Sequence, residues 1–343
     1  MCEIMRIALT APRRSVVAAL AIAVAGTICC ARARVSDPPG AATSAHLRAG
    51  NHEFTVMHAG RTRNFIVHMP PRTSGPMPVL VAFHGGGGNA AQFQRSSGID
   101  AVSDREGFVV VYPNGTGALA NRLLTFNAGD GCCGYARNND VDDVGFAVAA
   151  VNDLAQRTPV DRRRVYATGH SNGGMMAHRV GAEASDFFAA IAAVSGSLDL
   201  AGSRFAPENP VPVLQIHSVD DPRALYEGGL GPPFPGTNSR VLHQSVKQAL
   251  DRWIAANGCS TMADTLDRKV GAAATRNAGI AATKLAWRSC RGGAEVMHWK
   301  LSGSGHGWPG NAASGGGETL VGKQTNIIIA AEEVWSFVSR FSR

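Results

Sequence analysis

Features typical of nucleic-acid-binding proteins are scarce in this sequence. Charged residues make up only 17% of the 343 residues and aromatic residues 6%, and Lys and Arg are scattered without a basic stripe. Because nucleic-acid binding needs clustered positive charge, often with interleaved aromatic side chains, we do not expect a nucleic-acid partner. Residues 1–33 supply +3 of the net charge of +7. The positive net charge of the remaining residues indicates a mildly basic, solvated surface.

The N-terminal apolar run is too short to cross a membrane. It extends over 16–28, whereas a transmembrane helix needs about 20 apolar residues. Arg13 and Arg14 precede it and an A-x-A-like triplet at 31–33 follows it, so we predict a signal peptide over 1–33. The paired arginines leave a twin-arginine export route open. We therefore expect a secreted or periplasmic protein with no membrane association beyond the export signal.

Two other features of the N-terminal region bear on the mature protein. Cys29 and Cys30 follow Thr27 and Ile28 instead of the small residues of a lipobox, so we do not expect a lipid anchor. Residues 34–50 are rich in Ala, Gly, Pro and Ser, which predicts a disordered lead-in. The sequence does not indicate an oligomeric state.

Cysteine is also scarce, and cleavage of the leader would leave only Cys132, Cys133, Cys259 and Cys290. An even number of cysteines in an exported protein predicts disulfides. Cys259 follows a helical pattern and Cys290 follows a strand pattern, so these two are plausible partners. Cys132 and Cys133 are then left either as a vicinal disulfide or as free thiols. Because no C-x-x-C pair or histidine cluster stands nearby, we do not expect a metal site. We also expect no cofactor, because the mechanism predicted below requires none.

Short apolar runs alternate with helical patterns along the chain. Such runs are typical of strands buried on both faces of a parallel sheet. After an antiparallel hairpin over 53–58 and 63–69, the expected strands are 78–83, 108–112, 165–168, 191–194, 213–216 and 296–301. The expected helices are 99–106, 144–156, 172–184, 239–257 and 324–341, with Asp142 or Asp143 capping the second and Ser239 the fourth. The alternation predicts one α/β domain over 51–343, with a mostly parallel sheet and helices on both faces.

A serine stands at the turn between an expected strand and an expected helix. The sequence there is G-H-S-N-G, with Ser171 between Gly169 and Gly173. A serine in such a sharp turn needs small neighbours, because side chains two residues away would collide with the strand or the helix. With 40 glycines in the chain, the pattern alone is weak evidence.

Three other polar segments also follow expected strands. The run His84-Gly85-Gly86-Gly87-Gly88-Asn89 can direct backbone N–H groups at an anion. Asp220 and Asp221 follow the strand at 213–216, and either carboxylate is a candidate to orient a histidine. His306 stands among glycines after the last strand. The order Ser, Asp, His after successive strands is that of α/β-hydrolases.

This order predicts a mechanism of ester hydrolysis. His306 takes the proton of Ser171, the chosen aspartate orients His306, and the N–H groups of Asn172 and Gly86 bind the oxyanion. The expected partner is a small or polymeric ester substrate. A serine peptidase, an acyltransferase and an inactive binding protein on the same scaffold are the alternatives. Trp308, Tyr226 and Phe234 are candidates for an aromatic wall of the substrate site, although loop aromatics more often serve packing.

The polar motifs together resemble a known family. The set H-G-G-G-G-N, G-C-C-G followed by D-D-V-G-F, G-H-S-N-G-G-M, I-H-S-V-D-D-P and G-H-G-W-P-G is similar to secreted poly(3-hydroxybutyrate) depolymerases and feruloyl esterases. The resemblance implies a single-domain α/β-hydrolase acting on carboxylic esters. Because the family commonly reads H-G-T-A-D-P in the fourth motif, the resemblance implies that Asp221 is the triad carboxylate. His84 and His170, beside the glycine run and the serine, are included as candidate substrate-binding residues.

Overall fold

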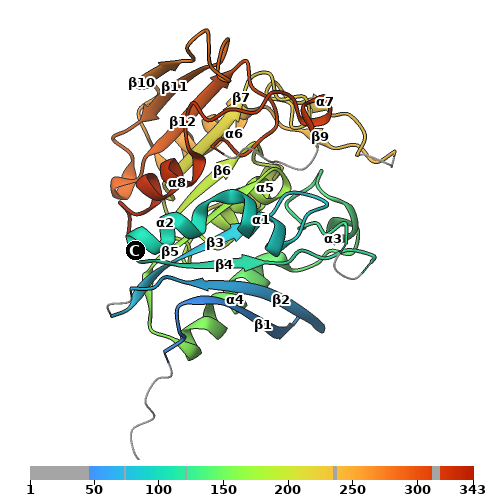
Figure 1. The fold of residues 1–343 in the computed structure, drawn as a ribbon, viewed down its shortest axis with the longest axis vertical. Helices are drawn as coiled ribbons and strands as arrows, with labels where there is room; N and C mark the ends of the chain where they lie inside the picture. The colour runs from blue at the N-terminus through green and yellow to red at the C-terminus, as the bar shows by residue number, and fades with distance from the viewer. Residues whose placement is uncertain (1–45, 73–74, 120–121, 235–237, 311–316) are drawn as a thin grey trace, which may run out of the picture. The chain divides into compact units, whose positions relative to one another are not determined.

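A mixed β-sheet runs through the computed structural model, which describes residues 46–72, 75–119, 122–234, 238–310 and 317–343 (Figure 1). The predicted signal peptide and residues 34–45 lie outside the described residues. The strands are β1 (Gly50–His58), β2 (Arg61–Met69), β3 (Met77–Phe83), β4 (Val109–Pro113), β5 (Val160–His170), β6 (Ala190–Val194), β7 (Val213–Ser218), β8 (Gly229–Leu230), β9 (Leu242–His243), β10 (Asp264–Val270), β11 (Ala281–Trp287) and β12 (Val296–Ser302). β8 and β9 form a separate antiparallel ribbon.

The centre of the main sheet is parallel. Its strand order is β1-β2-β4-β3-β5-β6-β7-β12-β11-β10, and the strands from β4 to β12 in this order pair in parallel. The two strands at each edge are added in antiparallel pairing. Every residue of β3, β4, β6 and β7 is buried, which explains why β3, β4 and β6 read as continuous apolar runs. The predicted mostly parallel sheet is confirmed.

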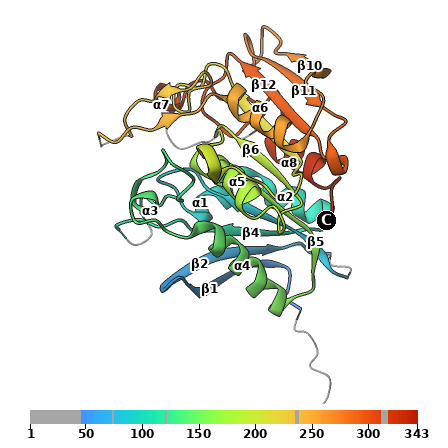
Figure 2. The same ribbon diagram turned by 180° about the vertical axis from the view of Figure 1, so that it is seen from behind.

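Helices cover both faces of the sheet, as Figures 1 and 2 show from opposite sides. They are α1 (Ala90–Ser97), α2 (Ile99–Glu106), α3 (Gly134–Asn138), α4 (Asp143–Arg157), α5 (Asn172–Glu183), α6 (Val246–Asn257), α7 (Gly317–Val321) and α8 (Ala330–Val338), with 3-10 turns at Gly202–Arg204 and Arg291–Gly293. Phe146, Val180 and Trp253 of α4, α5 and α6 share one hydrophobic core. Phe93 of α1 and Val334 of α8 belong to the core on the other face. In the described part of the chain, no helix is long and apolar enough to cross a bilayer.

The predicted hairpin at the start of the domain is present and longer than expected. β1 and β2 pair from Gly50 opposite Met69 to His58 opposite Arg61. Ala59 and Gly60 make the turn, and both have positive φ. The expected disordered lead-in over 34–50 is therefore wrong at its end, because Gly50 is already paired in the sheet.

The helix predicted over 239–257 is shorter than expected. α6 begins at Val246, and its cap is Ser245, whose hydroxyl accepts from the Gln248 N–H while the Gln248 side chain accepts from the Ser245 N–H. This reciprocal capping box stops the helix from extending further toward Ser239. The preceding residues are instead used in strand β9, which pairs with β8.

The helix predicted over 324–341 is also shorter. α8 begins only at Ala330, because the residues before it are bonded to another loop. The carbonyls of Lys323 and Thr325 accept from the N–H groups of Gly305 and Gly310. A helix from residue 324 would need the Thr325 carbonyl for its own ladder. The segment is thus held in a form that supports the loop of the last parallel strand.

The antiparallel edge formed by β10 and β11 was predicted only in part. A strand pattern was noted before Cys290, where β11 lies, whereas β10 was not predicted. β10 is exposed along most of its length, so its sequence carries no apolar alternation. A disulfide joins Cys259, just after α6, to Cys290, just after β11, as the sequence predicted. α1, α3, α7 and the β8–β9 ribbon were likewise not predicted.

Candidate active site

The candidate residues lie in loops that follow neighbouring parallel strands. Ser171 follows β5, Asp221 follows β7, His306 follows β12 and the glycine run follows β3. These strands are parallel neighbours or separated only by β6. Because the carboxyl ends of parallel strands meet at one edge of a sheet, the topology brings four distant segments together.

The turn at Ser171 has strained backbone geometry. Ser171 has φ 57° and ψ −120°, in the left-handed half of conformational space that non-glycine residues rarely adopt. Its N–H donates to the Val194 carbonyl at 2.9 Å, which ties the turn to β6. A Cβ at Gly169 would collide with the carbonyl of Gly173, and one at Gly173 would collide with the carbonyl of Phe83. The flanking glycines are therefore required by close backbone packing.

His306 lies within hydrogen-bonding distance of the serine. Its Nε2 is 2.8 Å from Ser171 Oγ. The glycines beside it permit close packing. A Cβ at Gly305 would collide with the Val321 carbonyl, which accepts from the His306 N–H. The loop is therefore fixed by the segment that precedes α8.

The two adjacent aspartates have different partners. Asp221 Oδ2 is 2.7 Å from His306 Nδ1, and Asp221 Oδ1 accepts from the N–H groups of Arg223 and Ala224. Asp220 turns the other way and accepts from the Gly303 N–H at 2.7 Å. The structure thus brings Asp221, and not Asp220, to the histidine.

Asp221 stays ionised despite being 4% exposed. Burial by itself would raise the pKa of its carboxyl. The charge of His306 and hydrogen bonds from His217 and His306 outweigh burial and hold the pKa of Asp221 well below its ordinary value. A permanent negative charge therefore faces His306 Nδ1, which fixes the tautomer that leaves Nε2 free to accept a proton from Ser171.

The glycine run lies against the serine turn. A Cβ at Gly86 would lie 3.6 Å from the Asn172 Cβ, and one at Gly85 would lie 3.5 Å from the Ser171 Cβ. In the described part of the chain, neither the Gly86 N–H nor the Asn172 N–H donates to another residue. Two unused N–H groups beside a serine hydroxyl can stabilise a developing oxyanion.

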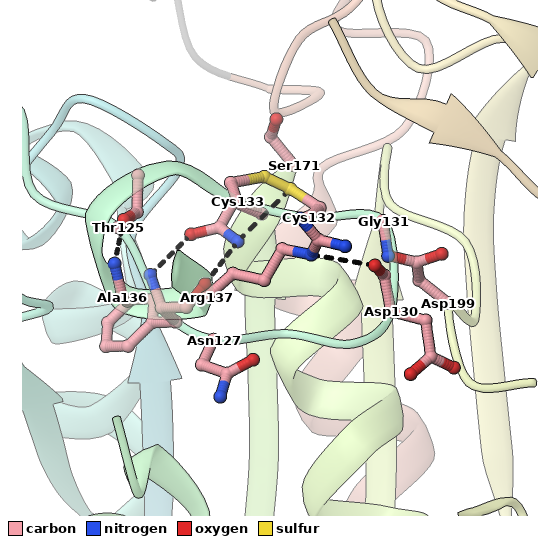
Figure 3. The surroundings of a disulfide bond; sticks show 12 residues. Thr125, Asn127, Asp130, Gly131, Cys132, Cys133, Ala136, Arg137, Ser171 and Asp199 are labelled. Carbon is pink, nitrogen blue, oxygen red and sulfur yellow. Dashed lines mark hydrogen bonds between the residues drawn. A yellow bond between two sulfur atoms is a disulfide. The ribbon is translucent and has the colours of Figure 1, made fainter. Parts of the chain in front are cut away.

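The side chain of Asn172 anchors a neighbouring loop. Its Oδ1 accepts from the Phe126 N–H at 2.8 Å, and its Nδ2 donates to the Phe126 carbonyl at 3.0 Å and toward Cys132 Sγ at 3.5 Å. Cys132 and Cys133 form a vicinal disulfide, one of the two states that the sequence left open (Figure 3). The loop that holds this disulfide therefore supports the residue next to Ser171.

A buried carboxylate lies beyond this disulfide. Asp199 accepts from the Gly131 N–H at 2.8 Å (Figure 3). Burial, reinforced by the charge of Asp130, raises the pKa of Asp199 to about 7, although the hydrogen bond from Gly131 opposes the rise. No group of three or more His, Cys, Asp or Glu side chains among the described residues is arranged to hold a metal ion.

The two candidate substrate-binding histidines have different surroundings. His84 is buried, with Nδ1 donating to the Gly85 carbonyl and Nε2 accepting from the Gly115 N–H. This residue locks the glycine run in place. The ring of His170 lies 5.0 Å from that of His306, and its Nε2 is buried with no hydrogen-bond partner among the described residues. Burial, helped by the charge of His306, lowers the pKa of His170 to about 3.

The three candidate aromatic residues separate in the structure. Trp308 is buried, and its Nε1–H donates to the Ser97 carbonyl at the end of α1. Tyr226 is 9% exposed, and its hydroxyl pairs with His298 Nε2 at 3.0 Å. The contacts of both residues are therefore those of core packing. By contrast, the ring of Phe234 would lie 3.2 Å from a Cβ at Gly86, so Phe234 borders the oxyanion region.

Sequence reasoning missed two histidines near the predicted triad. His217 lies inside the I-H-S-V-D-D-P motif, and its Nε2 is 3.3 Å from Asp221 Oδ2. Its position four residues before the aspartate was a signal that could have found it. His243 lies in β9, and the charge of His306, after burial, contributes to lowering its pKa to about 4. Its segment was predicted to be helical, so no site role was considered.

Comparison with solved structures identifies the class of fold. A structure described as a thermostable esterase has a TM-score of 0.52 and 14% sequence identity, over 85% of this chain and 63% of that one. At this identity the likeness concerns the fold alone, and it agrees with the mostly parallel sheet and its helical layers. The fold is that of the α/β-hydrolases, as predicted.

Comparison with protein families is more specific. The family described as "Esterase PHB depolymerase" matches residues 64–285, which include Ser171 and Asp221 and end before His306. The chain belongs to this family and is a carboxylic ester hydrolase. NocK of Nocardia uniformis subsp. tsuyamanensis, which is named as an esterase, is 30% identical over 85% of this chain and 88% of its own length. Feruloyl esterase B of Piromyces equi is 27% identical over 71% of this chain, which spans only 42% of that relative.

Proposed function

We propose that this protein is an exported serine esterase in which Ser171 attacks the ester carbonyl. His306 acts as general base and Asp221 orients it. One observation carries the proposal: the chain of contacts from Ser171 Oγ to His306 Nε2 at 2.8 Å, and from His306 Nδ1 to Asp221 Oδ2 at 2.7 Å. The strained backbone of Ser171 supports it, because such strain is typical of a nucleophile exposed at a turn.

The reaction proceeds through an acyl-enzyme. His306 takes the Ser171 proton as Oγ bonds to the carbonyl carbon, and the oxyanion accepts from the N–H groups of Gly86 and Asn172. His306 then gives its proton to the departing alcohol, leaving the acyl group on Ser171. Water attacks this ester with His306 again as base, which releases the acid and restores the serine. Each oxyanion donor contributes about 3 kcal/mol to lowering the barrier in comparable serine hydrolases.

The proposed substrates are esters with an apolar or aromatic part. Phe234 borders the oxyanion region and offers a flat apolar wall there. Relatives of the chain are named feruloyl esterase B, bifunctional acetylxylan esterase/xylanase and oxidized polyvinyl alcohol hydrolase. We therefore propose polyester oligomers, hydroxycinnamoyl esters or acetyl esters as the substrate class. The N-terminal sequence and the paired cysteines support export of a single catalytic domain.

The proposal is tested by replacing the nucleophile. Ser171→Ala should abolish hydrolysis of p-nitrophenyl butyrate and labelling by a fluorophosphonate probe, while circular dichroism and melting temperature stay unchanged. Ser96→Ala on α1 is the matched control, because Ser96 makes only a long hydrogen bond to the Phe93 carbonyl. Full activity in Ser171→Ala would overturn the assignment. Parallel assays of the wild type on methyl ferulate, hydroxybutyrate oligomers and acetylated xylan would rank the substrate classes.

A further inference from the structure

A second histidine holds the loop that carries Asp221. His217 is 1% exposed, and its Nε2 lies 2.8 Å from the Ala224 carbonyl and 3.3 Å from Asp221 Oδ2. Because a carbonyl can only accept, Nε2 must carry the proton and donate. The same turn is closed from its other side, where the Ala224 N–H donates to Asp221 Oδ1. His217 therefore fixes both the turn and the carboxylate within it.

A chain of buried hydrogen bonds sets the orientation of His217. The Trp253 Nε1–H of α6 donates to His178 Nδ1 at 3.0 Å, and His178 Nε2 lies 2.7 Å from Gln215 Oε1. The Gln215 Nε2 group in turn lies 3.1 Å from His217 Nδ1 and also donates to the Gly196 carbonyl.

Each bond in this chain determines the direction of the next. An indole N–H can only donate, so His178 Nδ1 accepts and His178 Nε2 carries the proton. Gln215 Oε1 accepts that proton, so its amide nitrogen donates to His217 Nδ1. His217 is thereby restricted to the tautomer with its proton on Nε2, facing Ala224 and Asp221. All four side chains are at most 1% exposed, so water does not compete for these bonds.

We propose that His217 is a positioning residue for the triad, and that the chain from Trp253 through His178 and Gln215 fixes the tautomer in which it donates to the Asp221 turn. This inference rests on the proposed function, since it assigns a role relative to the Ser171–His306–Asp221 triad. It links α5 and α6, which carry none of the proposed reacting groups except the Asn172 N–H, to the geometry of the base.

The other groups around His217 are neutral or already paired. The ring of Tyr226 packs edge-on against it at 5.9 Å, and Tyr226 pairs with His298. Burial lowers the pKa of His298 to about 3 and that of His178 to about 4, so both remain neutral at the pH of an esterase assay. His170 and His243 also lie close enough to sense His217, and burial keeps their pKa values low. Asp221 is the reacting group that His217 contacts, and Asp221 in turn bonds to His306.

The test uses two substitutions at one position. In His217→Gln, the amide nitrogen can take the place of Nε2 and still donate to the turn. In His217→Asn, the shorter side chain cannot reach it. We expect kcat/KM for p-nitrophenyl butyrate to fall about 10–100-fold in His217→Asn, mostly in kcat, with most of the loss recovered in His217→Gln.

The pH profile distinguishes positioning from stability. Without a donor from residue 217, the Asp221 carboxylate becomes a stronger base and favours the protonated form of His306. The acid limb of kcat/KM should therefore move to higher pH in His217→Asn and stay in place in His217→Gln. Ser103→Ala is the stability control, because it removes a buried hydrogen bond to the Phe108 carbonyl far from the triad. It should lower the melting temperature without moving the pH profile.

A second variant covers the case in which His217→Asn does not fold. Gln215→Met keeps the volume but removes the donor to His217 Nδ1, so both tautomers become accessible and kcat should fall about twofold or more. Equal activity and equal pH profiles in His217→Asn and His217→Gln would overturn the inference, as would wild-type kinetics in Gln215→Met. If Ser171→Ala also retained activity, the proposed function itself would fail. Loss of activity in Ser171→Ala with unchanged His217 variants would reject only the positioning role.

Discussion

The two sides of Ser171 are held in place by different kinds of interaction. The triad side, defined by His217, Asp221 and His306, is held by hydrogen bonds between buried side chains. The oxyanion side, defined by Gly86, Asn172, the Cys132–Cys133 disulfide and Asp199, offers backbone N–H groups supported by a packed loop. Substitutions that remove a hydrogen-bonding group should therefore lower activity most on the triad side. On the oxyanion side, substitutions that change the packing of the loop should lower it most.

Each side contains a buried aspartate, and the pair shows what partners do to a buried charge. Both Asp221 and Asp199 are 4% exposed. Two imidazoles donate to Asp221, and its pKa is held far below the ordinary value. At Asp199, burial and the charge of Asp130 raise the pKa to about 7. The hydrogen bonds from backbone N–H groups are too weak to offset this rise. Burial alone therefore does not predict the charge state of a carboxylate in this protein.

The largest effect is expected on the triad side. Asp221→Asn should lower kcat about 10⁴-fold, as removal of the charge from this position does in other serine hydrolases. Asp220→Asn is the matched control, because an amide oxygen can still accept from the Gly303 N–H. It should keep kcat within about threefold of the wild type. Steady-state kinetics on one p-nitrophenyl ester measures both, and a larger loss in Asp220→Asn would move the triad by one residue.

A smaller loss of activity is expected on the oxyanion side. In Gly86→Ala the new methyl group would meet the Phe234 ring at 3.2 Å, which is tighter than an ordinary contact, so the ring or the glycine run must move. Partial loss of one oxyanion donor should lower kcat about 10–100-fold with little change in KM.

A double variant identifies the cause of that loss. Gly86→Ala combined with Phe234→Leu removes the contact with the ring and should recover part of kcat relative to Phe234→Leu alone. Wild-type kcat in Gly86→Ala would contradict the role of this N–H group. No recovery in the double variant would show that the contact with the Phe234 ring is not the cause of the loss.

The smallest effect concerns stability and sharpens the contrast between the two aspartates. Because the pKa of Asp199 is about 7 in the folded state and near 4 in the unfolded state, the native state holds the extra proton between these values. The free energy of unfolding therefore falls as pH rises from about 4 to about 7. Asp199→Asn cannot titrate and should gain stability over the wild type across this window, on the order of 4 kcal/mol.

Urea unfolding at pH 5 and pH 8 measures this difference. Asp130→Asn is the matched control with the opposite sign. Burial is outweighed at Asp130 by bonds from the Ala201 N–H and Arg204, which lower its pKa below the unfolded value near 4. Asp130→Asn should therefore lose stability at every pH above about 4, by the same amount at pH 5 and at pH 8. Parallel pH dependence of Asp199→Asn and the wild type would show that Asp199 does not titrate in this range.

The central fold could be predicted because its strands are buried on both faces. Runs such as 78–83 and 191–194 are apolar throughout, and the structure places strands on both. The edges could not be predicted in the same way. β10 is solvent-exposed, and the segment at 239–245 has a helix-compatible sequence whose pairing with β8 is a long-range event. Local patterns do not contain such pairings.

The candidate site divides along the same line. Ser171, His306 and the glycine run could be proposed because each follows a predicted strand, and strand order determines where they meet. The support for the site could not be proposed. Trp253 and Gln215 look like ordinary core residues in the sequence, and only the three-dimensional contacts align them with Asp221. Trp308, by contrast, was proposed from its motif, and its contacts lie with α1.

The hydrogen bonds that hold the His306 loop have a consequence for the order in which the protein is made. The N–H groups of Gly305 and His306 donate to the carbonyls of Lys323 and Val321, which are synthesised after them. Tyr166 and Phe188 are likewise joined to Phe341 and Arg343 near the C-terminus. A nascent chain contains Ser171 and Asp221 long before the residues that secure His306 have emerged from the ribosome. Hydrolysis should therefore begin only after the chain has been synthesised beyond Lys323.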